Sequence, residues 1–412
     1  MNPRRGIEGP GWNWPRGRRE RTMEFGLSEE VLMMRGAVRQ FVERELLPLE
    51  REYEYDEVNL PREKRAELFQ QVTDIGLGGL FVPKEYGGPG IGFVERVAVQ
   101  EEIHATLVGY CAFGRPVYEG LALCTPEQKE EYLIPALWGL KLAHAGISEP
   151  ITGADPSMIE TYAEYRNGKY VINGRKTFIS GADESDFLLM YARMRGTEGR
   201  EGITCFLVDT DLPGFNIERH IPVMGLPTGV FGDKPCEVSL ENVEVSEDKI
   251  LGEIGKGWEI LQSSLGAVRL VFGPRNVALG ERCLKMSRDY ATSRTTFGRL
   301  LSDRQAVQWM LADSAIAIES LRWMGFHSAW KLDRGLDART EIAMLKVFGT
   351  EMLEQVSDRA IQIHGAIGIS KDLPLERIYR GARADRIVDG PNEVHRAVIA
   401  RNITRGYWFP GY

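Results

Sequence analysis

The chain lacks the sequence features of several protein classes. No apolar run reaches the roughly 18 residues that a membrane-spanning helix needs. The formal net charge of its 412 residues is −8, so no general positive field is available to hold nucleic acid or an anionic membrane surface. A polyanionic ligand could still bind a local group of arginines or lysines. The length permits two or three domains with a large buried core.

Cysteine is scarce, with five occurrences, and there are six histidines. The cysteines are scattered without any Cys-x-x-Cys spacing, and the histidines do not stand at the spacing of metal ligands. This pattern indicates reduced thiols in a cytoplasmic protein and predicts neither a disulfide framework nor a metal site. The cysteines are Cys111, Cys124, Cys205, Cys236 and Cys283.

Residues 1–22 lack serine, contain Glu8 and Glu20, and have no apolar stretch after their arginines. A signal peptide needs such a stretch, and a transit peptide is rich in serine and poor in acidic residues. With six arginines and four glycines, the segment should not fold alone. We expect a disordered basic extension, as would result from translation starting upstream of Met23, with a targeting role as the alternative.

After this extension the apolar residues recur at helical spacing. Ser28 is a candidate N-cap for the first helix, and Pro48 should end that helix. Two further helical segments are expected near residues 62–76 and 92–106. The pattern predicts an all-α domain over residues 23–141.

The pattern changes to period two in residues 142–250, which predicts a small β-domain. Asn167-Gly168 and Asn173-Gly174 each stand where a two-residue hairpin turn would. Residues 187–191 and 203–208 read as strands buried on both faces or nearly so.

Long helices return in residues 251–412. Apolar residues form one helical stripe over residues 307–324 and another over 342–363, separated by the glycine-containing segment 333–337. Stripes of this length are typical of the core of a helix bundle. The expected fold is therefore α+β, with a helical domain, a β-domain and a helical bundle in that order.

Four short segments carry the candidate chemistry. In the first, the Ser148 hydroxyl and exposed backbone N–H groups could bind a polar ring system, or could simply cap a turn. In the second, Phe178 and Ser180 should lie on one face of a strand, because strand side chains alternate. The four segments are AHAGISEPITGAD at 143–155, KTFISG at 176–181, RTTFG at 294–298 and DGPNEVH at 389–395.

In this order and at these separations, the four segments resemble the flavin and base sites of acyl-CoA dehydrogenases. The resemblance covers about residues 24–403 and implies FAD as cofactor, a β-barrel or β-sandwich middle domain and a C-terminal four-helix bundle. It implies that Ile147 and Ser148 lie along the isoalloxazine ring, with Phe178 and Ser180 beside it. The family often has Trp and Thr at the last two positions. It also assigns Ala154 to the acyl-CoA site, although the family usually has Ser there.

The resemblance further implies that part of the chain binds the FAD of a neighbouring subunit. Arg294 would pair with the diphosphate, which is a charge-assisted interaction. Gln305 would lie at the adenine end, and the Gln-Ile-His-Gly-Ala-Ile-Gly turn at 362–368 would approach the dinucleotide. A shared site implies a homotetramer or homodimer. The cofactor residues assigned in this part are Arg294, Phe297, Gln305, Gln362, Gly365, Asn392 and Glu393.

Asp389 aligns with the family's catalytic base, where Glu is commonest and a subgroup has Asp-Gly-Pro. A carboxylate there would take the α-proton of an acyl thioester. The alternative is a surface aspartate that caps the helix expected from residue 392. Isovaleryl-type relatives take their base from a position that aligns with Val268, which has no acid–base chemistry. Arg269 matches a family arginine near the active site and CoA, or serves in a structural ion pair.

The resemblance implies an FAD-dependent acyl-CoA dehydrogenase. Such an enzyme introduces a trans-2,3 double bond by α-proton abstraction and β-hydride transfer to flavin N5, and passes electrons to an electron-transfer flavoprotein. Two alternatives remain at this point. One is a flavin oxidase of the same fold, similar to nitroalkane oxidase, which also uses Asp as base. The other is a helical scaffold without cofactor or catalysis.

Overall fold

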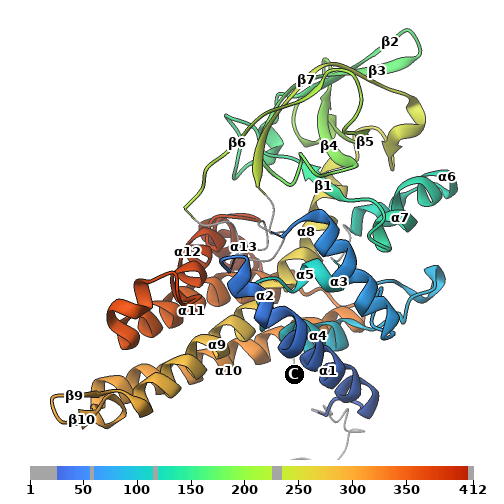
Figure 1. Ribbon diagram of the computed structural model, residues 1–412. Coiled ribbons are helices and arrows are strands. Elements are labelled where there is room, and N and C mark those ends of the chain that lie inside the picture. Colours follow the sequence, from blue (N-terminus) through green and yellow to red (C-terminus); the bar gives the residue numbers. More distant parts are fainter. Residues whose placement is uncertain (1–25, 56–59, 115–118, 225–233, 407–412) are drawn as a thin grey trace, which may run out of the picture.

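The computed structural model describes residues 26–55, 60–114, 119–224 and 234–406. Figure 1 shows a β-domain at one end of the molecule and long helices at the other, with the N-terminal helices packed beside the bundle. The expected α+β arrangement is confirmed. The basic extension at 1–22 lies outside the described residues. No described helix is long and apolar enough to cross a membrane.

The N-terminal part is helical, as expected. The Ser28 hydroxyl accepts a hydrogen bond from Val31 N at 3.3 Å, so Ser28 is the predicted N-cap. The prediction that Pro48 ends the helix is wrong. The chain passes through a π-helical turn, Val42–Leu46, into a further helix that has Pro48 in its first turn, where proline has no hydrogen bond to lose. The helices are α1 (Glu29–Phe41), α2 (Leu47–Glu52), α3 (Arg62–Asp74), α4 (Phe93–Ile103), α5 (Tyr110–Phe113), α6 (Pro126–Gln128) and α7 (Ile134–Leu137).

Eight strands form one mixed sheet in the β-domain. Seven follow the order β6-β7-β3-β2-β4-β5-β8, and β1 pairs in parallel with β4. One buried apolar cluster draws residues from β2 to β8, so the sheet curls around it. The strands are β1 (Ala143–Gly146), β2 (Tyr162–Arg166), β3 (Lys169–Ser180), β4 (Phe187–Met194), β5 (Ile203–Asp209), β6 (Phe215–His220), β7 (Pro235–Val245) and β8 (Ile250–Leu251).

The two predicted Asn-Gly turns have different outcomes. Asn167 and Gly168 join β2 to β3 with φ values of 51° and 82°, as a two-residue hairpin requires. Asn173-Gly174 is not a turn. It lies inside β3 at an irregularity in the pairing with β7, where a Cβ on Gly174 would come within 2.7 Å of Thr161 Cα. This glycine therefore permits a close approach of two strands.

The strands predicted to be buried on both faces are β4 and β5. Leu188 and Met190 of β4 point into the core inside the sheet. Phe187 and Leu189 point the other way, into a second core shared with Tyr132 of the N-terminal part. A helical cover on the outer face explains why these strands do not alternate between apolar and polar residues.

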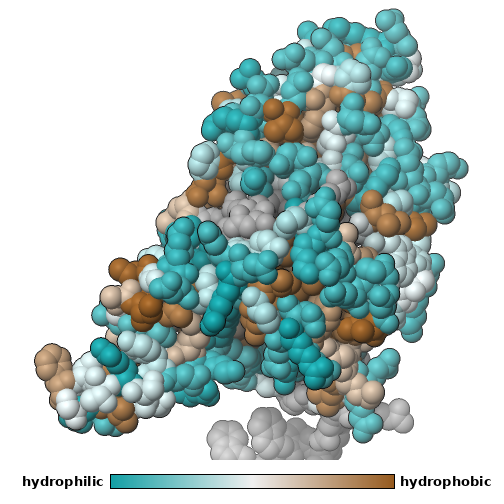
Figure 2. All heavy atoms as spheres, viewed as in Figure 1, coloured by the Kyte–Doolittle hydropathy of each residue, from teal (hydrophilic) through white to brown (hydrophobic). Residues whose placement is uncertain are grey.

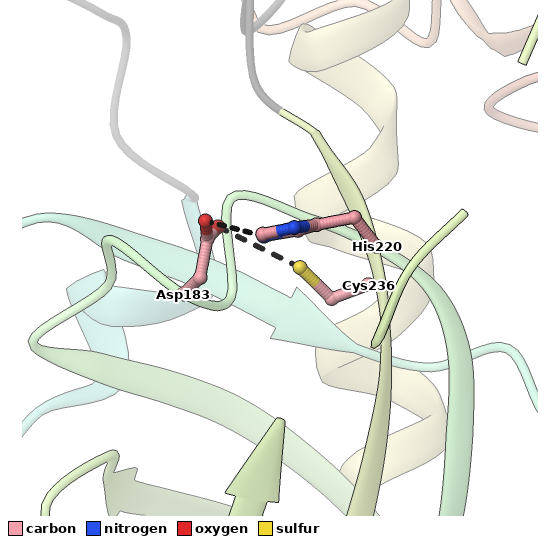
Figure 3. Close-up of side chains that lie close together, drawn as sticks. All are labelled: Asp183, His220 and Cys236. Carbon is pink, nitrogen blue, oxygen red and sulfur yellow. Dashed lines mark hydrogen bonds and ion pairs between the residues drawn. The ribbon is translucent and has the colours of Figure 1, made fainter. Parts of the chain in front are cut away.

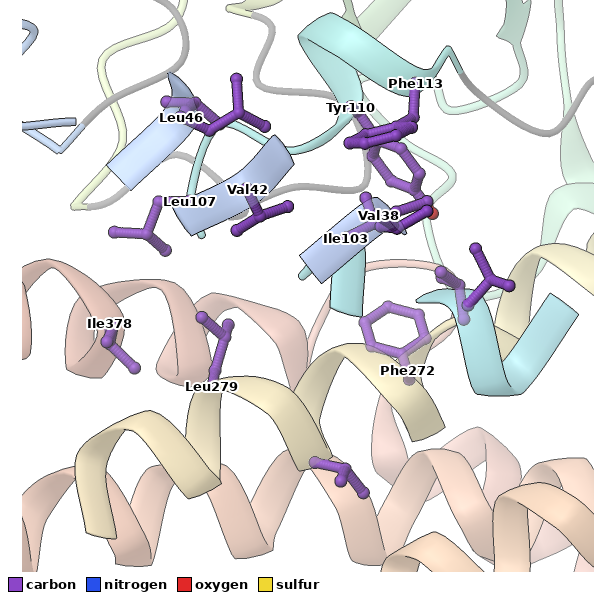
Figure 4. Close-up of a cluster of buried hydrophobic side chains, with 14 of the residues drawn as sticks. Val38, Val42, Leu46, Ile103, Leu107, Tyr110, Phe113, Phe272, Leu279 and Ile378 are labelled. Atoms are coloured by element: carbon purple, nitrogen blue, oxygen red, sulfur yellow. The ribbon is translucent and has the colours of Figure 1, made fainter. Parts of the chain in front are cut away.

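The C-terminal part is a bundle that shares its core with the N-terminal helices. Figure 4 shows Val38, Ile103 and Phe113 facing Phe272 and Leu279 across this core. The apolar stripe of residues 342–363 is buried in the bundle, except that Phe348 is 36% exposed. In the 307–324 stripe only Ile318 and Leu321 are buried. The elements are α8 (Gly257–Leu270), α9 (Phe272–Ser293), β9 (Thr295–Thr296), β10 (Arg299–Leu300), α10 (Gln305–Asp333), α11 (Arg339–His364), α12 (Leu375–Asp385) and α13 (Asn392–Thr404).

Candidate active site

The β-domain brings two of the sequence-predicted segments together. The backbone N–H of Thr177 donates to the carbonyl of Ser148 at 2.9 Å, so the segment after β1 lies against β3. The pairing of β3 with β7 shifts between Lys176 and Ile179, which marks a bulge. Within it Phe178 has a φ of 55°, and its side chain is 59% exposed. Ile179 is buried, whereas Phe178 is exposed and Ser180 is half-buried. Because the bulge interrupts the alternation of the strand, the placement of Phe178 and Ser180 on one face stays a prediction.

A buried ion pair between Lys176 and Glu149 holds the two segments together. Lys176 Nζ lies 2.8 Å from Glu149 Oε1 and also donates to the carbonyls of Ile147 and Tyr191, at 3.2 and 2.7 Å. The Glu149 carboxylate accepts the backbone N–H groups of Glu160 and Thr161, at 2.6 and 3.0 Å. Burial lowers the pKa of Lys176 to about 8. The pair therefore fixes the backbone at Ile147 without being exposed to solvent.

Asp389 lies in a turn between α12 and α13 that is held by an arginine, a lysine and a histidine. The residue has a φ of 53°, and its carbonyl accepts from Arg269 Nε at 2.9 Å. His395 Nε2 lies 3.2 Å from the same carbonyl. Lys346 Nζ donates to the carbonyl of Gly390 at 2.8 Å. The N-cap position of α13 is Pro391, with no side-chain cap, so Asp389 is not the helix cap that the alternative interpretation required.

Burial and the charges around this turn shift the pKa of the Asp389 carboxyl in opposite directions. Burial raises the pKa of Asp389, and the positive charges of Arg269, Lys346 and Arg275 oppose that rise. Burial also lowers the pKa of Lys346 to about 8 and the pKa of His395 to about 4. His395 is therefore neutral near pH 7, and its Nε2 must carry the proton if it is to donate to the Asp389 carbonyl. Within the described residues, the Asp389 carboxylate itself makes no hydrogen bond.

Three further residues assigned to the site from the sequence are Asn392, Glu393 and Ala154. Asn392 is 1% exposed, and its side chain accepts from Lys346 Nζ at 3.0 Å and donates to Thr350 Oγ1 at 3.0 Å. These contacts make the Asn392 side chain an internal support of the Asp389 turn. The assignment of Asn392 to the cofactor stays a prediction. Glu393 is exposed in the first turn of α13, and Ala154 is exposed in the loop between β1 and β2.

The residues assigned to a neighbour's cofactor gather elsewhere, at the far end of the bundle. Figure 1 shows the β9–β10 hairpin at the tip of α9 and α10, distant from the β-domain. The Tyr290 ring stacks on His364 with centroids 4.6 Å apart, so the ends of α9 and α11 lie side by side. The assigned residues at this end are exposed, and they are Arg294, Phe297, Gln305, Gln362 and Gly365. The single chain thus does not bring them to Phe178 or Ser180.

Several residues that build the site could not be recognised from the sequence. Lys346 is fully buried in the middle of α11, and the Arg275–Asp385 pair is fully buried beside the Asp389 turn. Charged residues in long helices are usually solvated, so nothing in the pattern distinguished these. Lys176 lies in one of the four motif segments, but its burial follows only from the fold, which places its amine against Glu149 and the carbonyls of Ile147 and Tyr191.

Three comparisons with known proteins agree on one family. Residues 28–139, 145–243 and 255–404 match the N-terminal, middle and C-terminal domains of acyl-CoA dehydrogenase, respectively. The chain belongs to the acyl-CoA dehydrogenase family. It is accordingly an oxidoreductase that acts on CH–CH groups, with FAD as the family's cofactor.

Individual relatives are similar over most of their length. The chain is 35% identical to (R)-benzylsuccinyl-CoA dehydrogenase of Thauera aromatica, covering 92% of this chain and 97% of that protein. A subunit of a caffeyl-CoA reductase-Etf complex of Acetobacterium woodii is 30% identical, over 90% of this chain and 98% of that protein. Butyryl-CoA dehydrogenase of Megasphaera elsdenii has a solved structure that matches with a TM-score of 0.83 at 26% identity, over 93% of this chain and 100% of that one.

The residues present fit FAD. An apolar ring of Phe178 stands exposed beside Ser180 on a bulged strand, as a surface that packs against a flat ring system requires. The Arg294 guanidinium is exposed and makes no ion pair within the described part of the chain, so it is available to a diphosphate.

Proposed function

We propose that this chain desaturates an acyl-CoA thioester to the trans-2-enoyl-CoA, with Asp389 as the base that takes the α-proton. The observation that carries the proposal is the Asp389 turn, in which a carboxyl with a raised pKa is fixed through its own backbone by Arg269. When bound, FAD supplies the acceptor for the β-hydride at its N5 atom. Asp389 gains the proton, and the substrate loses the two hydrogens as H⁺ and hydride.

The side chains around Asp389 support this role by fixing and tuning the carboxyl. Arg269 and His395 hold its carbonyl, and Lys346 holds the next carbonyl, so the backbone at the base is fixed on both sides of the Cα. A base must be held within about 1 Å of its productive position, because misplacement can cost about 10²-fold in rate. The positive charges of Arg269 and Lys346 oppose the effect of burial and so favour the ionised form of Asp389, which can accept a proton.

The proposed acceptor of electrons is an electron-transfer flavoprotein. A relative that is named as part of a reductase-Etf complex supports this choice. Because some relatives are named reductases, the net direction depends on the acceptor, and Asp389 would return the proton to the α-carbon in the reverse reaction. Anaerobic bleaching of the flavin by a panel of acyl-CoAs tests the proposal. Oxygen consumption without any other acceptor would favour the oxidase alternative, and bleaching by none of the acyl-CoAs would count against the proposal.

We further propose that the distal end of the bundle completes the FAD site of a second subunit in a homodimer or homotetramer. Figure 2 shows apolar side chains exposed over this end of the molecule. At this end of the bundle Phe297 is 97% exposed and Ile369 is 70% exposed. Large apolar side chains that are exposed together on one chain are typical of a surface that another subunit covers.

Replacing Arg294 by Ala should weaken FAD binding about 10- to 100-fold, because a charge-assisted hydrogen bond contributes about 1.5–3 kcal/mol. FAD retention is measured by fluorescence after dilution, with subunit association followed by light scattering. Arg299→Ala is the matched control, since Arg299 is an exposed arginine of the same hairpin. Equal FAD retention in the two variants would remove Arg294 from the site, and a fully active monomer would contradict the shared site.

The rate of flavin reduction should rise with pH through the pKa of Asp389, because the base acts as its carboxylate. Lys346 stabilises that carboxylate, so Lys346→Met should move the rise to higher pH by about one unit. The comparison is made below the Lys346 pKa of about 8, where the wild-type lysine is charged. Lys285→Met, at an exposed position of α9, is the control. An unshifted profile in Lys346→Met would show that Lys346 does not act on the titrating base.

A further inference from the structure

Asp183, His220 and Cys236 lie close together in the β-domain. His220 Nε2 lies 2.8 Å from Asp183 Oδ2, and Cys236 Sγ lies 3.6 Å from Asp183 Oδ1. One possible ligand atom from each residue lies within 4.8 Å of the others. Figure 3 shows the imidazole and the thiol both directed toward the carboxylate. The residues come from the end of β6, the start of β7 and the turn after β3.

Backbone pairing positions these three side chains. His220 and Cys236 are directly opposite each other in the β6–β7 ladder, so their side chains stand side by side on one face. The turn that carries Asp183 is closed by a hydrogen bond from Glu184 N to the carbonyl of Gly181 at 3.1 Å. Gly181 N also donates to the carbonyl of Lys234, two residues before Cys236, at 3.0 Å. The cluster is therefore built into the sheet and does not depend on a chance encounter of surface side chains.

We propose that Asp183, His220 and Cys236 bind a zinc-type divalent metal ion through oxygen, nitrogen and sulfur, with the fourth position open to water. Zinc accepts this ligand set in tetrahedral geometry, in which ligand atoms lie ~3.4–3.6 Å apart given bonds of about 2.3 Å to sulfur and about 2.1 Å to oxygen or nitrogen. The separation of Cys236 Sγ from Asp183 Oδ1 is 3.6 Å, and His220 Nε2 lies 2.8 Å from the other oxygen, Oδ2. The three ligand atoms lie within 4.8 Å of one another. Binding through one carboxylate oxygen therefore requires a rearrangement of the Asp183 and His220 side chains, which are both partly exposed.

The arrangement fits a metal better than a nucleophilic thiol. In a thiol nucleophile the imidazole contacts the sulfur and takes its proton. In this cluster the imidazole and the sulfur both contact the Asp183 carboxylate, and the sulfur also contacts the carbonyl of Lys234. No hydrogen bond joins the imidazole to the sulfur among the described residues. Binding of the ion would displace the thiol proton into solvent.

The site has an entry path and a structural consequence. The His220 side chain is 48% exposed and Asp183 is 26% exposed, whereas Cys236 is fully buried, so an ion would enter from the solvent side and be fixed by the sulfur. The ion would join β6 and β7 to the turn three residues after Ser180. Metal binding would therefore brace the strand that carries Phe178, and it does not depend on the proposed catalytic role of Asp389.

Zinc binding to the FAD-loaded enzyme, prepared without a polyhistidine tag, tests this inference by isothermal titration calorimetry. The wild-type protein should bind one zinc ion per chain, and His220→Gln and Cys236→Ser should each weaken binding by about 100-fold or more. Loss of outer-sphere partners alone costs about 10–100-fold, and a lost ligand should cost at least as much. Cobalt(II) should give ligand-field bands at longer wavelength than flavin absorption, with a thiolate band that Cys236→Ser removes.

Two control variants distinguish loss of a metal ligand from a general effect of the substitution. Cys111→Ser and His327→Gln change the same residue types outside the cluster and should bind zinc as the wild type does. Cys236 is buried and its substitution could disturb the fold, whereas His220 is at the surface, so His220→Gln decides the matter on folded protein. Zinc should also raise the thermal unfolding temperature of the wild type and not of His220→Gln. Absent zinc binding, or binding unchanged in His220→Gln, would overturn the proposal.

Discussion

Replacing Asp389 by Asn is expected to lower the rate of flavin reduction by about 10²- to 10⁴-fold or more, since that is the usual contribution of a positioned base. Acyl-CoA should still bind, because Asn keeps the shape and the backbone N–H at this position. The loss should therefore appear in the limiting rate of reduction and not in the substrate dissociation constant. Anaerobic stopped-flow spectroscopy with a good acyl-CoA substrate measures both quantities.

Two further variants sharpen this test. Asp358→Asn removes a carboxylate from an exposed position of α11 and should leave the rate unchanged. Asp389→Glu lengthens the side chain by roughly one C–C bond, about 1.5 Å. If the backbone is set for the shorter side chain, Glu crowds the substrate and slows reduction; if Asp reaches poorly, Glu speeds it. A wild-type rate in Asp389→Asn would refute the assignment of the base.

Replacing Lys176 by Met should destabilise the β-domain by about 3–5 kcal/mol, because it leaves the Glu149 carboxylate buried without its cation. The two side chains are 0% and 3% exposed, so water does not replace the lost partner. Urea unfolding followed in parallel by circular dichroism and tryptophan fluorescence measures the change. Both probes are needed because a chain with several domains need not unfold in one transition.

The chain contains a matched control on the same strand. Lys169 pairs with Glu244 at 2.9 Å, but these side chains are 54% and 57% exposed, so Lys169→Met should cost less than about 1 kcal/mol. The double variant Lys176→Met with Glu149→Gln should recover part of the loss, because Gln keeps an acceptor for the N–H groups of Glu160 and Thr161. Similar costs for Lys176→Met and Lys169→Met would mean that the buried pair adds nothing beyond a surface pair.

Helix caps and turns could be predicted from the sequence where they depend only on residues close by in the chain. Ser28 caps its helix, and Asn167-Gly168 turns its hairpin, because each depends on neighbouring backbone groups alone. The same dipeptide at Asn173-Gly174 marks an approach to Thr161, and Pro48 continues a helix, because tertiary packing decided both cases. A pattern of residue types does not contain that information.

In the candidate site, too, the motif residues could be predicted from the sequence, whereas the residues that support them through tertiary packing could not. The motif segments identified Ser148, Phe178, Ser180 and Asp389 as candidates, since their residue types and order match a family. The supports of those residues were invisible, because Lys176 and Lys346 look like ordinary solvated lysines until the fold buries them. The cluster of Asp183, His220 and Cys236 was missed for a related reason. Its members are far apart in the chain, and only strand pairing makes them neighbours.

The left-handed backbone at Asp389 has a consequence for how this protein could lose its activity by mutation. Most L-residues are disfavoured at a φ of 53°, but Asp and Asn adopt such conformations more readily than other non-glycine residues. The codons for Asp and Asn differ by one base. A single point mutation could therefore remove the base while leaving the turn, the fold and the cofactor surface intact. Descendants that keep the flavoprotein scaffold without desaturation are thus close to this sequence, and the residue at 389 would distinguish them from active enzymes.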